Sequence, residues 1–450
     1  LIMNSEILNL PKLETCKVAI IGMGYVGLPL AVNFANKKIC TKTKDKLDRE
    51  IIGYDISKKR IEELKVGIDL TREVESLELK TASSLKFTDN EDDLKLADVF
   101  IITVPTPIDE NNKPNLTAII KASKLVGRAL KNRKSVIKPI VIYESTVFPG
   151  ATEEICIPEI ESESKFKLNY DFFCGYSPER INPGDKNRRL SDVVKVVSGS
   201  TESSAIWIDK LYSSIIKAGI CKASSIKIAE AAKVIENTQR DLNIALVNEL
   251  AMIFSELNLD TNEIIDVAST KWNFQDFRPG LVGGHCIGVD PYYLTYKSEL
   301  VGYYPQLVLA GRRINEGMSK WIVEKLVLKL ITKGIDIPNS KTLVIGFTFK
   351  ENCPDIRNTK TFDIIKQLNK YNISPTIVDP LADIEECKKI YNLELHNKIP
   401  KIKFDIIIVT VGHKDFKKMN TKNWFELISK RGEIIDLKNV IPREVNAIRI

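Results

Sequence analysis

Apolar runs that alternate with helical patterns dominate the first third of the chain. Four runs rich in β-branched residues have the length of buried strands: residues 18–22 (VAIIG), 51–55 (IIGYD), 99–104 (VFIITV) and 139–144 (PIVIYE). Residues 25–36 follow the first run with helical spacing, and the charged residues 37–50 are expected to form a solvated loop. Continuous apolar strands separated by helices predict a doubly wound parallel sheet, because helices cover both faces of such a sheet.

The middle of the chain has a helical pattern. Residues 226–259 contain no glycine or proline and keep apolar residues at helical spacing, which predicts one long helix or two nearly continuous ones. Such a helix could form a spine between domains or pack against a second subunit. Residues 319–330 predict another helix that leads into the last domain.

The last part of the chain restarts the α/β pattern. Its expected strands are residues 342–347 (TLVIGF), 375–379 (PTIVD), 404–411 (FDIIIVTV) and 433–436 (EIID), with a helix over residues 361–371. The first three strands weakly repeat VAIIG, IIGYD and VFIITV from the first part. We therefore expect an α/β fold in which two Rossmann-like, doubly wound parallel-sheet domains are joined by a central helical domain with a long helix. The expected domains are residues 15–222, 223–330 and 331–450.

Length and composition agree with this organisation. A chain of 450 residues is too long for one ordinary core and indicates two or three domains. A hydrophobic content of 44% with 28% charged residues is typical of a soluble globular protein. The longest apolar stretch, residues 18–32, is interrupted by three glycines and is too short to span a membrane. The first residues lack the basic start of a secretion signal, so a cytoplasmic location is expected.

Charge and cysteine content restrict the classes of partner. The net charge of +7 comes from lysines and arginines scattered along the chain, which disfavours nucleic acid but suits small anions such as nucleotides. The eight cysteines form no C-x-x-C pair and are expected to be reduced thiols. With only three histidines, a histidine-rich metal centre is not expected, and we assign no metal.

A glycine-rich turn closes the first strand and opens the first helix. Gly22 permits a tight turn, Gly24 lets backbone N–H groups approach a pyrophosphate, and Gly27 lets the helix pack close to the sheet. Tyr25 and Val26 lie inside this turn and are expected to contact the same ligand. The pattern predicts dinucleotide binding, although glycines in such a turn can also serve packing alone.

An acidic residue at the end of the second expected strand indicates which dinucleotide is bound. The Asp55 carboxylate would bind the ribose hydroxyls of NAD and repel the additional phosphate of NADP. The charged segment 37–50 explains why Asp55 lies further from the glycines than usual. Arg60, within one turn of Asp55, could soften the discrimination against NADP.

Cys286 differs from the other cysteines in its surroundings. It lies in GGHCIGVDP (residues 283–291), where glycines leave room for a substrate and His285 and Asp290 are close in sequence. A nucleophilic thiolate needs such an open, polar environment, whereas a typical cysteine is a small buried apolar residue. The segment indicates a functional thiol.

Other candidate residues are ambiguous when taken alone. Lys233 and Asn237 are four residues apart on the long helix and share one face, where they could stabilise an oxyanion or form a solvated stripe. Glu179, in YSPER (176–180), lies near the end of a strand or in a simple turn. Thr146, in EST (144–146), ends another strand where it could reach a ligand.

These pieces, in this order, resemble the UDP-glucose/GDP-mannose dehydrogenase family over about residues 17–440. The matching segments are GMGYVG (22–27), TVPTP (103–107), EST (144–146), YSPER (176–180), AAKVIENTQRDLNIALVNE (231–249), GGHCIGVDP (283–291) and GFTFKENCPDIRNT (346–359). The resemblance implies an N-terminal NAD-binding domain, a central helical domain with the dimer contact and active-site residues, and a C-terminal nucleotide-sugar-binding domain. A homodimer or higher homo-oligomer is expected.

The resemblance also implies individual roles. Cys286 would be the nucleophile, with Lys233 and Asn237 as oxyanion stabilisers. Thr146, Glu179 and Asp290 would organise water and proton transfer.

Further residues are implied to bind the ligands. Thr106 would line the NAD pocket beside Thr146, and Arg357 would reach the NAD. The residues implied to bind the nucleotide-sugar are Glu179, Arg180, Lys233, Asn237, Phe277, Gly280 and Lys350.

Three positions depart from the UDP-glucose enzymes of this family. Pro183 stands where they carry a second glutamate, so Glu179 would act alone. His285 precedes the nucleophile where a smaller residue is usual, and Lys438 stands where arginine is frequent.

The chemistry implied by the family consists of two oxidations. A primary alcohol is oxidised to an aldehyde, the Cys286 thiolate adds to give a thiohemiacetal, and oxidation to a thioester precedes hydrolysis to the carboxylate. Two NAD are consumed per sugar. A two-electron dehydrogenase would need no cysteine, and a non-catalytic NAD-binding protein would have no reason to keep Cys286, Lys233 and Asn237 together.

The expected substrate is a UDP-N-acetylhexosamine. Residues 269–293, 351–360 and 67–74 resemble the branch that acts on UDP-N-acetylglucosamine or UDP-N-acetylgalactosamine for surface polysaccharides. A buried acetamido group needs one donor and one acceptor, which Arg278, Asn273 or His285 could supply. UDP-N-acetylmannosamine and UDP-glucose are the alternatives by the same mechanism.

Replacing Asp55 with a small neutral residue, as in Asp55→Ala, should weaken NAD binding by about tenfold and relax the exclusion of NADP. The change removes both an acceptor for the ribose hydroxyls and a repulsive charge. Apparent affinities for both cofactors, measured in parent and variant, check this expectation. An unchanged ratio between them would contradict the role of Asp55.

Overall fold

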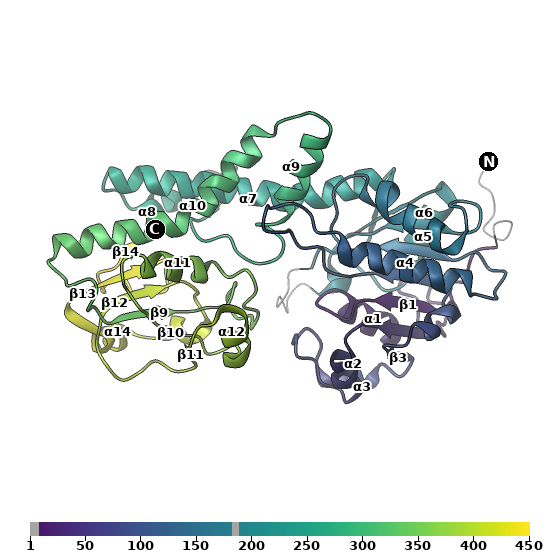
Figure 1. Ribbon diagram of the computed structural model, residues 1–450, viewed down its shortest axis with the longest axis horizontal. Coiled ribbons are helices and arrows are strands. Elements are labelled where there is room, and N and C mark those ends of the chain that lie inside the picture. Colours follow the sequence, from purple (N-terminus) through teal and green to yellow (C-terminus); the bar gives the residue numbers. More distant parts are fainter. Residues whose placement is uncertain (1–8, 182–188) are drawn as a thin grey trace. The chain divides into compact units, whose positions relative to one another are not determined.

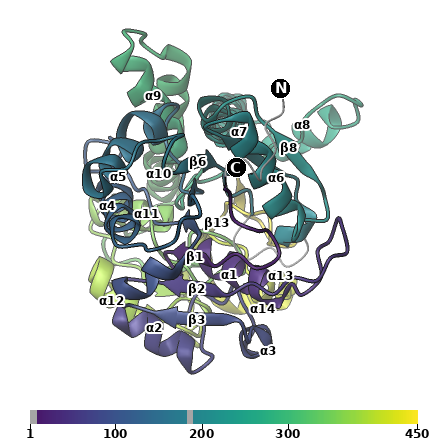
Figure 2. The same ribbon diagram turned by 90° about the vertical axis from the view of Figure 1, so that its right-hand side faces the viewer.

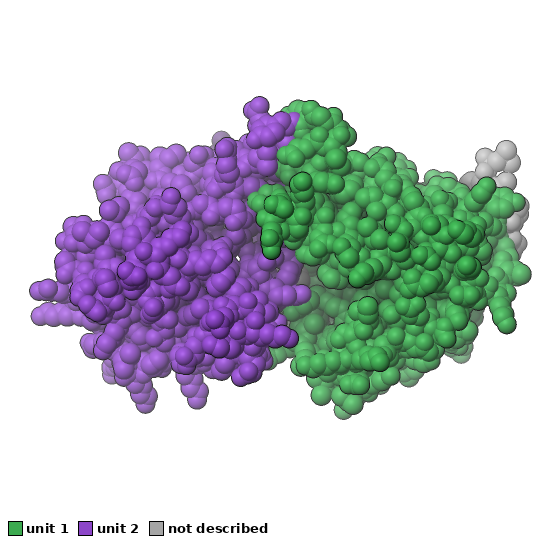
Figure 3. All heavy atoms as spheres, in the orientation of Figure 1, with its two compact units in different colours: residues 1–236, 292–303 green, residues 237–291, 304–450 purple. Residues whose placement is uncertain are grey.

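The computed structural model describes residues 9–181 and 189–450, so Pro183 lies outside the described residues. Contacts divide the chain into two compact units (Figure 3). The first unit comprises Leu1–Glu236 and Tyr292–Tyr303, and the second comprises Asn237–Pro291 and Tyr304–Ile450. Each unit contains its own sheet, and each is described separately below.

The first unit contains an eight-stranded sheet in the order β3-β2-β1-β4-β5-β6-β7-β8. Its strands are β1 (Val18–Ile21), β2 (Ile51–Tyr54), β3 (Leu85–Thr88), β4 (Val99–Ile102), β5 (Ile140–Tyr143), β6 (Phe173–Tyr176), β7 (Lys195–Gly199) and β8 (Ile220–Lys222). The first six strands are parallel, and β7 pairs antiparallel with β6. The order 3-2-1-4-5-6 is that of a dinucleotide-binding Rossmann sheet. Figure 2 shows β1, β2 and β3 next to one another.

Helices cover both faces of this sheet (Figure 1). They are α1 (Gly27–Asn36), α2 (Lys58–Lys65), α3 (Ser76–Thr81), α4 (Thr117–Lys131), α5 (Ile157–Ser164) and α6 (Glu202–Ser213), with short turns at Glu91–Leu96, Thr152–Cys156 and Leu190–Asp192. The helix α9 (Asp290–Leu300) belongs to this unit from Tyr292 onward. On one face α1 and α6 meet through Phe34 and Tyr212, whose ring centroids are 6.0 Å apart. On the other face the Tyr143 hydroxyl lies 2.7 Å from Ser123 of α4. Both faces are therefore buried, as the continuous apolar strands require.

The charged segment 37–50 is a loop, but part of it is buried. Arg49 is only 4% exposed and donates hydrogen bonds to the carbonyl of Leu13 and the hydroxyl of Ser214. Cys40 and Leu47 are buried beside it. The expectation of a wholly solvated loop is thus wrong at these three residues, because the long arginine side chain satisfies polar groups of the fold.

The second unit contains a six-stranded, all-parallel sheet in the order β11-β10-β9-β12-β13-β14. Its strands are β9 (Thr342–Ile345), β10 (Thr376–Val378), β11 (Leu395–His396), β12 (Phe404–Val409), β13 (Ile428–Asp436) and β14 (Ile448–Arg449). Numbered within the unit, this is again the order 3-2-1-4-5-6. The expected fold class, with two Rossmann-like sheets and a long helix between them in sequence, is confirmed.

The remaining helices are α7 (Ile226–Glu256), α8 (Thr261–Ala268), α10 (Gln306–Thr332), α11 (Lys360–Asn369), α12 (Ile384–Tyr391), α13 (Lys414–Lys417) and α14 (Thr421–Leu427). The long helix α7 belongs to the first unit up to Glu236 and to the second from Asn237. Met318 and Leu330 of α10 share one buried cluster with Ile408 of the second sheet. The helix expected over residues 319–330 is therefore twice as long as its apolar pattern indicated, and it packs on the C-terminal sheet. The division into three domains stays a proposal.

Both sheets repeat one local arrangement at their first strand. Gly22 and Gly346 follow β1 and β9 with positive φ angles of 101° and 92°, so the strands end one residue before each glycine. The N–H of each glycine donates to the second strand at 2.8 Å. Thr103 and Thr410, after the fourth strand of each unit, donate to the carbonyls on either side of this turn. The two segments that weakly repeat each other in sequence therefore also form the same hydrogen bonds around the glycine turn.

Among the described helices, none is long and apolar enough to cross a membrane.

Candidate active site

The glycine turn of the first unit is shaped for close approach by a ligand. A Cβ atom on Gly27 would lie 1.8 Å from the Gly22 carbonyl oxygen, so only glycine allows α1 to begin here. A Cβ on Gly24 would meet nothing within 4 Å, so the protein itself does not require glycine at this position. The remaining reason for glycine there is space for a ligand, as backbone contact with a pyrophosphate demands. The turn fits NAD, with Tyr25 and Val26 at the start of α1.

Asp55 contacts the glycine turn directly. Its Oδ2 accepts the N–H of Met23 at 2.8 Å, and its Oδ1 accepts the N–H of Ser57 at 2.9 Å. Arg60 is bound elsewhere: it donates to the Met23 carbonyl and forms a 2.8 Å ion pair with the buried Asp69. The pKa of Asp69 lies below its ordinary value, because hydrogen bonds from Thr71 and Arg60 outweigh the opposing effect of burial. The guanidinium of Arg60 thus already has an anionic partner, which disfavours its use for the phosphate of NADP.

Two threonines meet beyond the carboxyl ends of β4 and β5. The Thr106 hydroxyl donates to the Thr146 carbonyl at 2.7 Å, and the Ser145 hydroxyl donates to the Val104 carbonyl at 2.6 Å. Tyr293 of α9 donates to the Thr106 carbonyl at 2.7 Å. This edge of a parallel sheet is where ligands of doubly wound folds bind. The structure therefore brings both predicted threonines to the edge that also carries the glycine turn.

Glu179 follows β6 at the same edge. Its Oε1 accepts the N–H groups of Arg180 at 2.6 Å and Ile181 at 2.5 Å, so the carboxylate caps its own turn. Arg180 forms a 2.7 Å ion pair with Glu236 of α7. Lys233, one turn earlier on α7, is 8% exposed. A buried lysine cannot belong to a solvated stripe, which removes the simpler interpretation of that residue.

In the second unit, Cys286 lies in a turn that leads into α9. All eight cysteines are thiols, and only Cys221 and Cys286 are exposed. The Cys286 carbonyl accepts the N–H of Asp290 at 2.8 Å, and the Asp290 carboxylate accepts the amide of Asn237 at 2.6 Å. Asp290 is only 2% exposed. The structure thus links three of the predicted residues: Cys286 to Asp290 through the backbone, and Asp290 to Asn237 through their side chains.

His285 and Arg357 share the carboxylate of Asp355. The Asp355 oxygens lie 3.2 Å from His285 Nε2 and 2.7 Å from an Arg357 nitrogen. Burial opposes ionisation of Asp355, but hydrogen bonds from His285 and Arg357 hold its pKa well below the ordinary value. The sequence analysis did not identify Asp355, although it lies two residues before Arg357. Asp355 thus links His285 to the segment of residues 346–359.

A pocket beside β9 and β12 has a cationic, hydroxyl-rich lining. Its residues are Leu281, Gly283, Phe349, Val411, four threonines (Thr348, Thr359, Thr361 and Thr410) and three lysines (Lys350, Lys360 and Lys438). Lys360 has carboxylate partners in Glu316 and Asp363. A lining of ammonium and hydroxyl groups suits a diphosphate.

Gly280 lies close to one lysine of this pocket. A Cβ atom built on it would lie 4.0 Å from the Lys438 ammonium. The side-chain amide of Asn248 donates to the Gly280 carbonyl and accepts the Gly280 N–H. Phe277 is half-buried, and Asn273 is exposed. Arg278 forms ion pairs with Asp266 and Asp276. The amide of α7 that positions Gly280 was not predicted.

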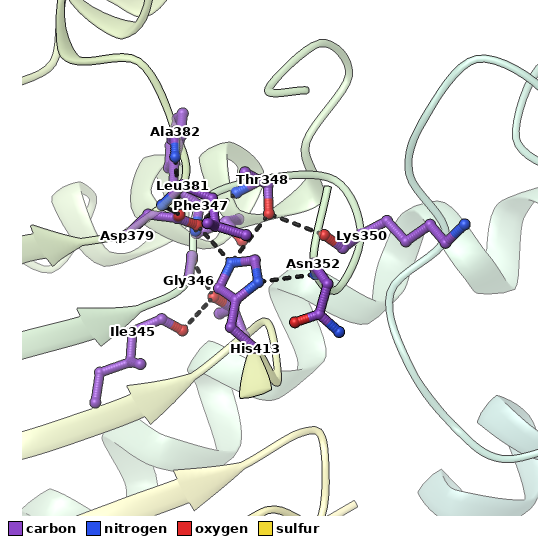
Figure 4. A network of polar contacts seen from close by, with 12 residues as sticks. Ile345, Gly346, Phe347, Thr348, Lys350, Asn352, Asp379, Leu381, Ala382 and His413 are labelled. Carbon is purple, nitrogen blue, oxygen red and sulfur yellow. Dashed lines mark hydrogen bonds and ion pairs between the residues drawn. The ribbon is translucent and has the colours of Figure 1, made fainter. Parts of the chain in front are cut away.

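A buried histidine holds the loop that carries Lys350 (Figure 4). His413 is 1% exposed, and its Nδ1 accepts the N–H of Asn352 at 2.9 Å. Its Nε2 lies 2.9 Å from Asp379, so Nε2 carries the proton and donates. Thr348 lies 3.2 Å from the same nitrogen and donates to the Lys350 carbonyl at 2.9 Å. The backbone of the loop is therefore fixed, while Figure 4 shows the Lys350 side chain extending away from the network.

Asp379 occupies in the second sheet the place that Asp55 has in the first. It accepts the N–H groups of Phe347 and Thr348 through Oδ2 and those of Leu381 and Ala382 through Oδ1. These bonds and His413 keep its pKa below the ordinary value against the effect of burial. With no exposed surface, Asp379 cannot reach a ribose. A helix also does not begin at this turn, since α11 starts only at Lys360.

Within the described residues, no cluster of histidine, cysteine or carboxylate side chains could hold a metal ion.

Comparison with known proteins identifies the family of the chain. Sequence models of the UDP-glucose/GDP-mannose dehydrogenase family match residues 16–216 (NAD binding domain), 227–317 (central domain) and 343–443 (UDP binding domain). The chain belongs to the UDP-glucose/GDP-mannose dehydrogenase family. Its activity is therefore that of an NAD-dependent nucleotide-sugar dehydrogenase.

Individual relatives match over nearly the whole chain. The chain is 51% identical over 438 residues to the UDP-N-acetyl-D-glucosamine 6-dehydrogenase of Salmonella typhi, covering 97% of this chain and 99% of that protein. It is 50% identical to the enzyme of that name from Pseudomonas aeruginosa, covering 97% and 100%. Among solved structures, the UDP-D-ManNAc dehydrogenase of Pyrococcus horikoshii superposes with a TM-score of 0.83 at 29% identity, covering 96% and 98%.

Replacing His413 with phenylalanine should lower stability by about 1–3 kcal/mol, because the N–H of Asn352 loses its acceptor inside the fold. It should also weaken UDP binding, since the loop that carries Lys350 loses its anchor. Thermal unfolding with and without UDP measures both effects. His396→Phe is the matched control, because His396 is exposed. Equal UDP-induced stabilisation in the two variants would contradict the role of His413.

Proposed function

We propose that the chain oxidises carbon 6 of UDP-N-acetylglucosamine to the uronic acid. The relatives at 51% and 50% identity bear the name of this activity and align from end to end. The observation that carries the chemistry is the exposed Cys286, whose backbone carbonyl accepts the N–H of Asp290, the buried carboxylate that Asn237 binds. UDP-N-acetylgalactosamine is the nearest alternative, because it differs only in the configuration at carbon 4.

Cys286 performs the covalent step. The first oxidation removes a hydride and a proton from the primary alcohol and leaves an aldehyde. The Cys286 thiolate adds to the aldehyde carbon, and the oxygen becomes an oxyanion that Lys233 and Asn237 stabilise. Loss of a second hydride from this thiohemiacetal gives a thioester. When bound, NAD supplies the hydride acceptor for both oxidations, so two NAD are consumed per sugar.

Hydrolysis completes the reaction. Water adds to the thioester carbon, the carbon–sulfur bond breaks, and the Cys286 thiolate leaves as the carboxylate forms. Thr146, Glu179 and Asp290 organise the water, and a carboxylate among them accepts its proton. Asp290 suits this role because it is buried and hydrogen-bonded to the amide of Asn237, which keeps the carboxylate oriented.

The proposal includes one site for NAD and one for the nucleotide-sugar. NAD is bound by Gly22, Gly24, Gly27, Asp55 and Thr106, with Tyr25, Val26, Arg60, Thr146 and Arg357 as further contacts. The nucleotide-sugar is bound by Lys350, Gly280, Phe277, Glu179, Arg180, Lys233 and Asn237. The ion pair between Arg60 and Asp69 supports a role of Arg60 in shaping the glycine turn rather than in binding phosphate.

The cellular and quaternary setting is part of the proposal. The chain acts as three functional domains, residues 15–222, 223–330 and 331–450, and assembles at least as a homodimer. Eight thiols without a disulfide suit the reducing cytoplasm. No nucleic acid or membrane partner is required.

Cys286→Ser should abolish uronate formation without unfolding the protein, because a hydroxyl is a much weaker nucleophile at neutral pH. The loss should be at least about a thousandfold in the rate of uronate formation, in line with the removal of a nucleophile. Cys221→Ser is the matched control, since Cys221 is the other exposed cysteine. A folded Cys286→Ser enzyme that turns over near the parent rate would contradict the covalent mechanism.

A panel of nucleotide-sugars should give the highest specificity constant with UDP-N-acetylglucosamine and two NADH per sugar oxidised. NADH absorbance and product mass measure both quantities with UDP-N-acetylgalactosamine, UDP-N-acetylmannosamine and UDP-glucose as competitors. One NADH per sugar would indicate a two-electron dehydrogenase, and none would indicate a non-catalytic NAD-binding protein. A clear preference for UDP-glucose would overturn the substrate and leave the enzyme class standing.

A further inference from the structure

A lysine inside the first unit is surrounded by anionic oxygen atoms. Lys195 begins β7, and its side chain is only 3% exposed. Its ammonium donates to Glu144 Oε2 at 2.7 Å and to the Pro178 carbonyl at 3.1 Å. Tyr212 of α6 donates to the other oxygen of Glu144, which is fully buried. A buried charge is costly unless it is paired and hydrogen-bonded, so this cluster is an integral part of the fold.

The third neighbour of this ammonium is Glu179. Glu179 Oε2 lies 3.7 Å from Lys195 Nζ, and the Glu179 side chain is 12% exposed. Oε1 of Glu179 is occupied by two backbone N–H groups. Oε2 is buried and has no hydrogen-bond partner among the described residues. This oxygen therefore keeps its capacity to bind a water or substrate hydroxyl, while Lys195 compensates its charge.

We infer that Lys195 is a positioning residue for the oxidation and hydrolysis proposed above: it holds the turn of Glu179 through the Pro178 carbonyl and compensates the charge of the Glu179 carboxylate beside Glu144. The inference rests on the proposed function. It also supplies a partner for Glu179 that the sequence analysis lacked. Glu144, which follows β5 and lies two strands before β7 in sequence order, is the second carboxylate of a pair bridged by one ammonium.

The charge balance explains why an ammonium is needed. Two carboxylates and one ammonium carry a net charge of −1, whereas the carboxylates alone would carry −2 in a buried place. Burial raises the pKa of the Glu144 carboxyl, Lys195 opposes this rise, and Glu179 adds to it. Without Lys195, the two carboxylates would repel each other in a buried place, and the pair as a whole would take up a proton more readily and serve less well as a base for water.

The other groups around the pair do not replace Lys195. Tyr212 of α6 donates to Glu144, and the Lys195 ammonium lies 5.2 Å from the Tyr212 ring centroid. Arg180 is directed to Glu236 of α7 and to the Val194 carbonyl. These two charges are about one-third exposed and compensate each other. Among the residues that the structure describes, Lys195 is the cation in contact with both carboxylates.

The test compares pH profiles of kcat for four variants, with UDP-N-acetylglucosamine and NAD. Lys195→Met should lower kcat at neutral pH by about tenfold or more and move the acidic limb up by about one pH unit. Glu144→Gln should move this limb down, because Lys195 then faces Glu179 alone. Lys195→Met/Glu144→Gln restores the net charge of −1 and should return the limb toward the parent position. Lys195→Arg keeps the charge and should leave the limb in place.

A merely structural role would give a different result. It predicts that the double variant is as impaired as Lys195→Met and that the acidic limb moves in none of the variants. Either outcome overturns the inference. If Lys195→Met does not fold, the downward shift in Glu144→Gln and the unshifted limb of Lys195→Arg still decide it. A parent protein that forms no NADH with any nucleotide-sugar overturns the proposed function and the role of Lys195 together, whereas an active parent with unshifted variants overturns only the latter.

Discussion

A carboxylate that accepts backbone N–H groups at the end of the second strand organises each half of the chain. Asp55 binds the N–H of Met23, and Asp379 binds that of Phe347. Both N–H groups follow a glycine with positive φ and cannot join the sheet, so each needs an acceptor inside the turn. The turn that presents a ligand-binding loop exists because this requirement is met.

The two sheets differ in what surrounds that carboxylate, and this difference assigns the ligands. In the first sheet Gly27 lets a helix begin at the turn, and Asp55 remains partly exposed. In the second sheet His413 covers Asp379, and a long loop with Lys350 precedes the next helix. The first arrangement suits a dinucleotide and the second a nucleotide diphosphate, in agreement with the NAD and UDP binding domains of the family.

Buried polar groups also support the candidate site residues. Asn237 orients Asp290, Asp355 links His285 to Arg357, and Lys195 bridges two carboxylates. In each case a group that would be costly to bury alone is compensated by a partner distant in sequence. The candidate site residues are thus held in place by interactions within the protein itself.

The sequence by itself determined the α/β class, both sheets, the long helix, the glycine turn and the family, because each of these depends on short-range periodicity or contiguous motifs. Only the tertiary structure decided which residues meet. It buried Arg49 in a loop expected to be solvated, paired Arg60 with Asp69, and gave Glu179 a partner in Lys195. These pairings join residues as far apart as 165 positions, from Arg49 to Ser214, and no local pattern encodes them. The sequence does not show whether a polar side chain is hydrogen-bonded to water or to a buried partner, because this depends on how distant parts of the chain pack together.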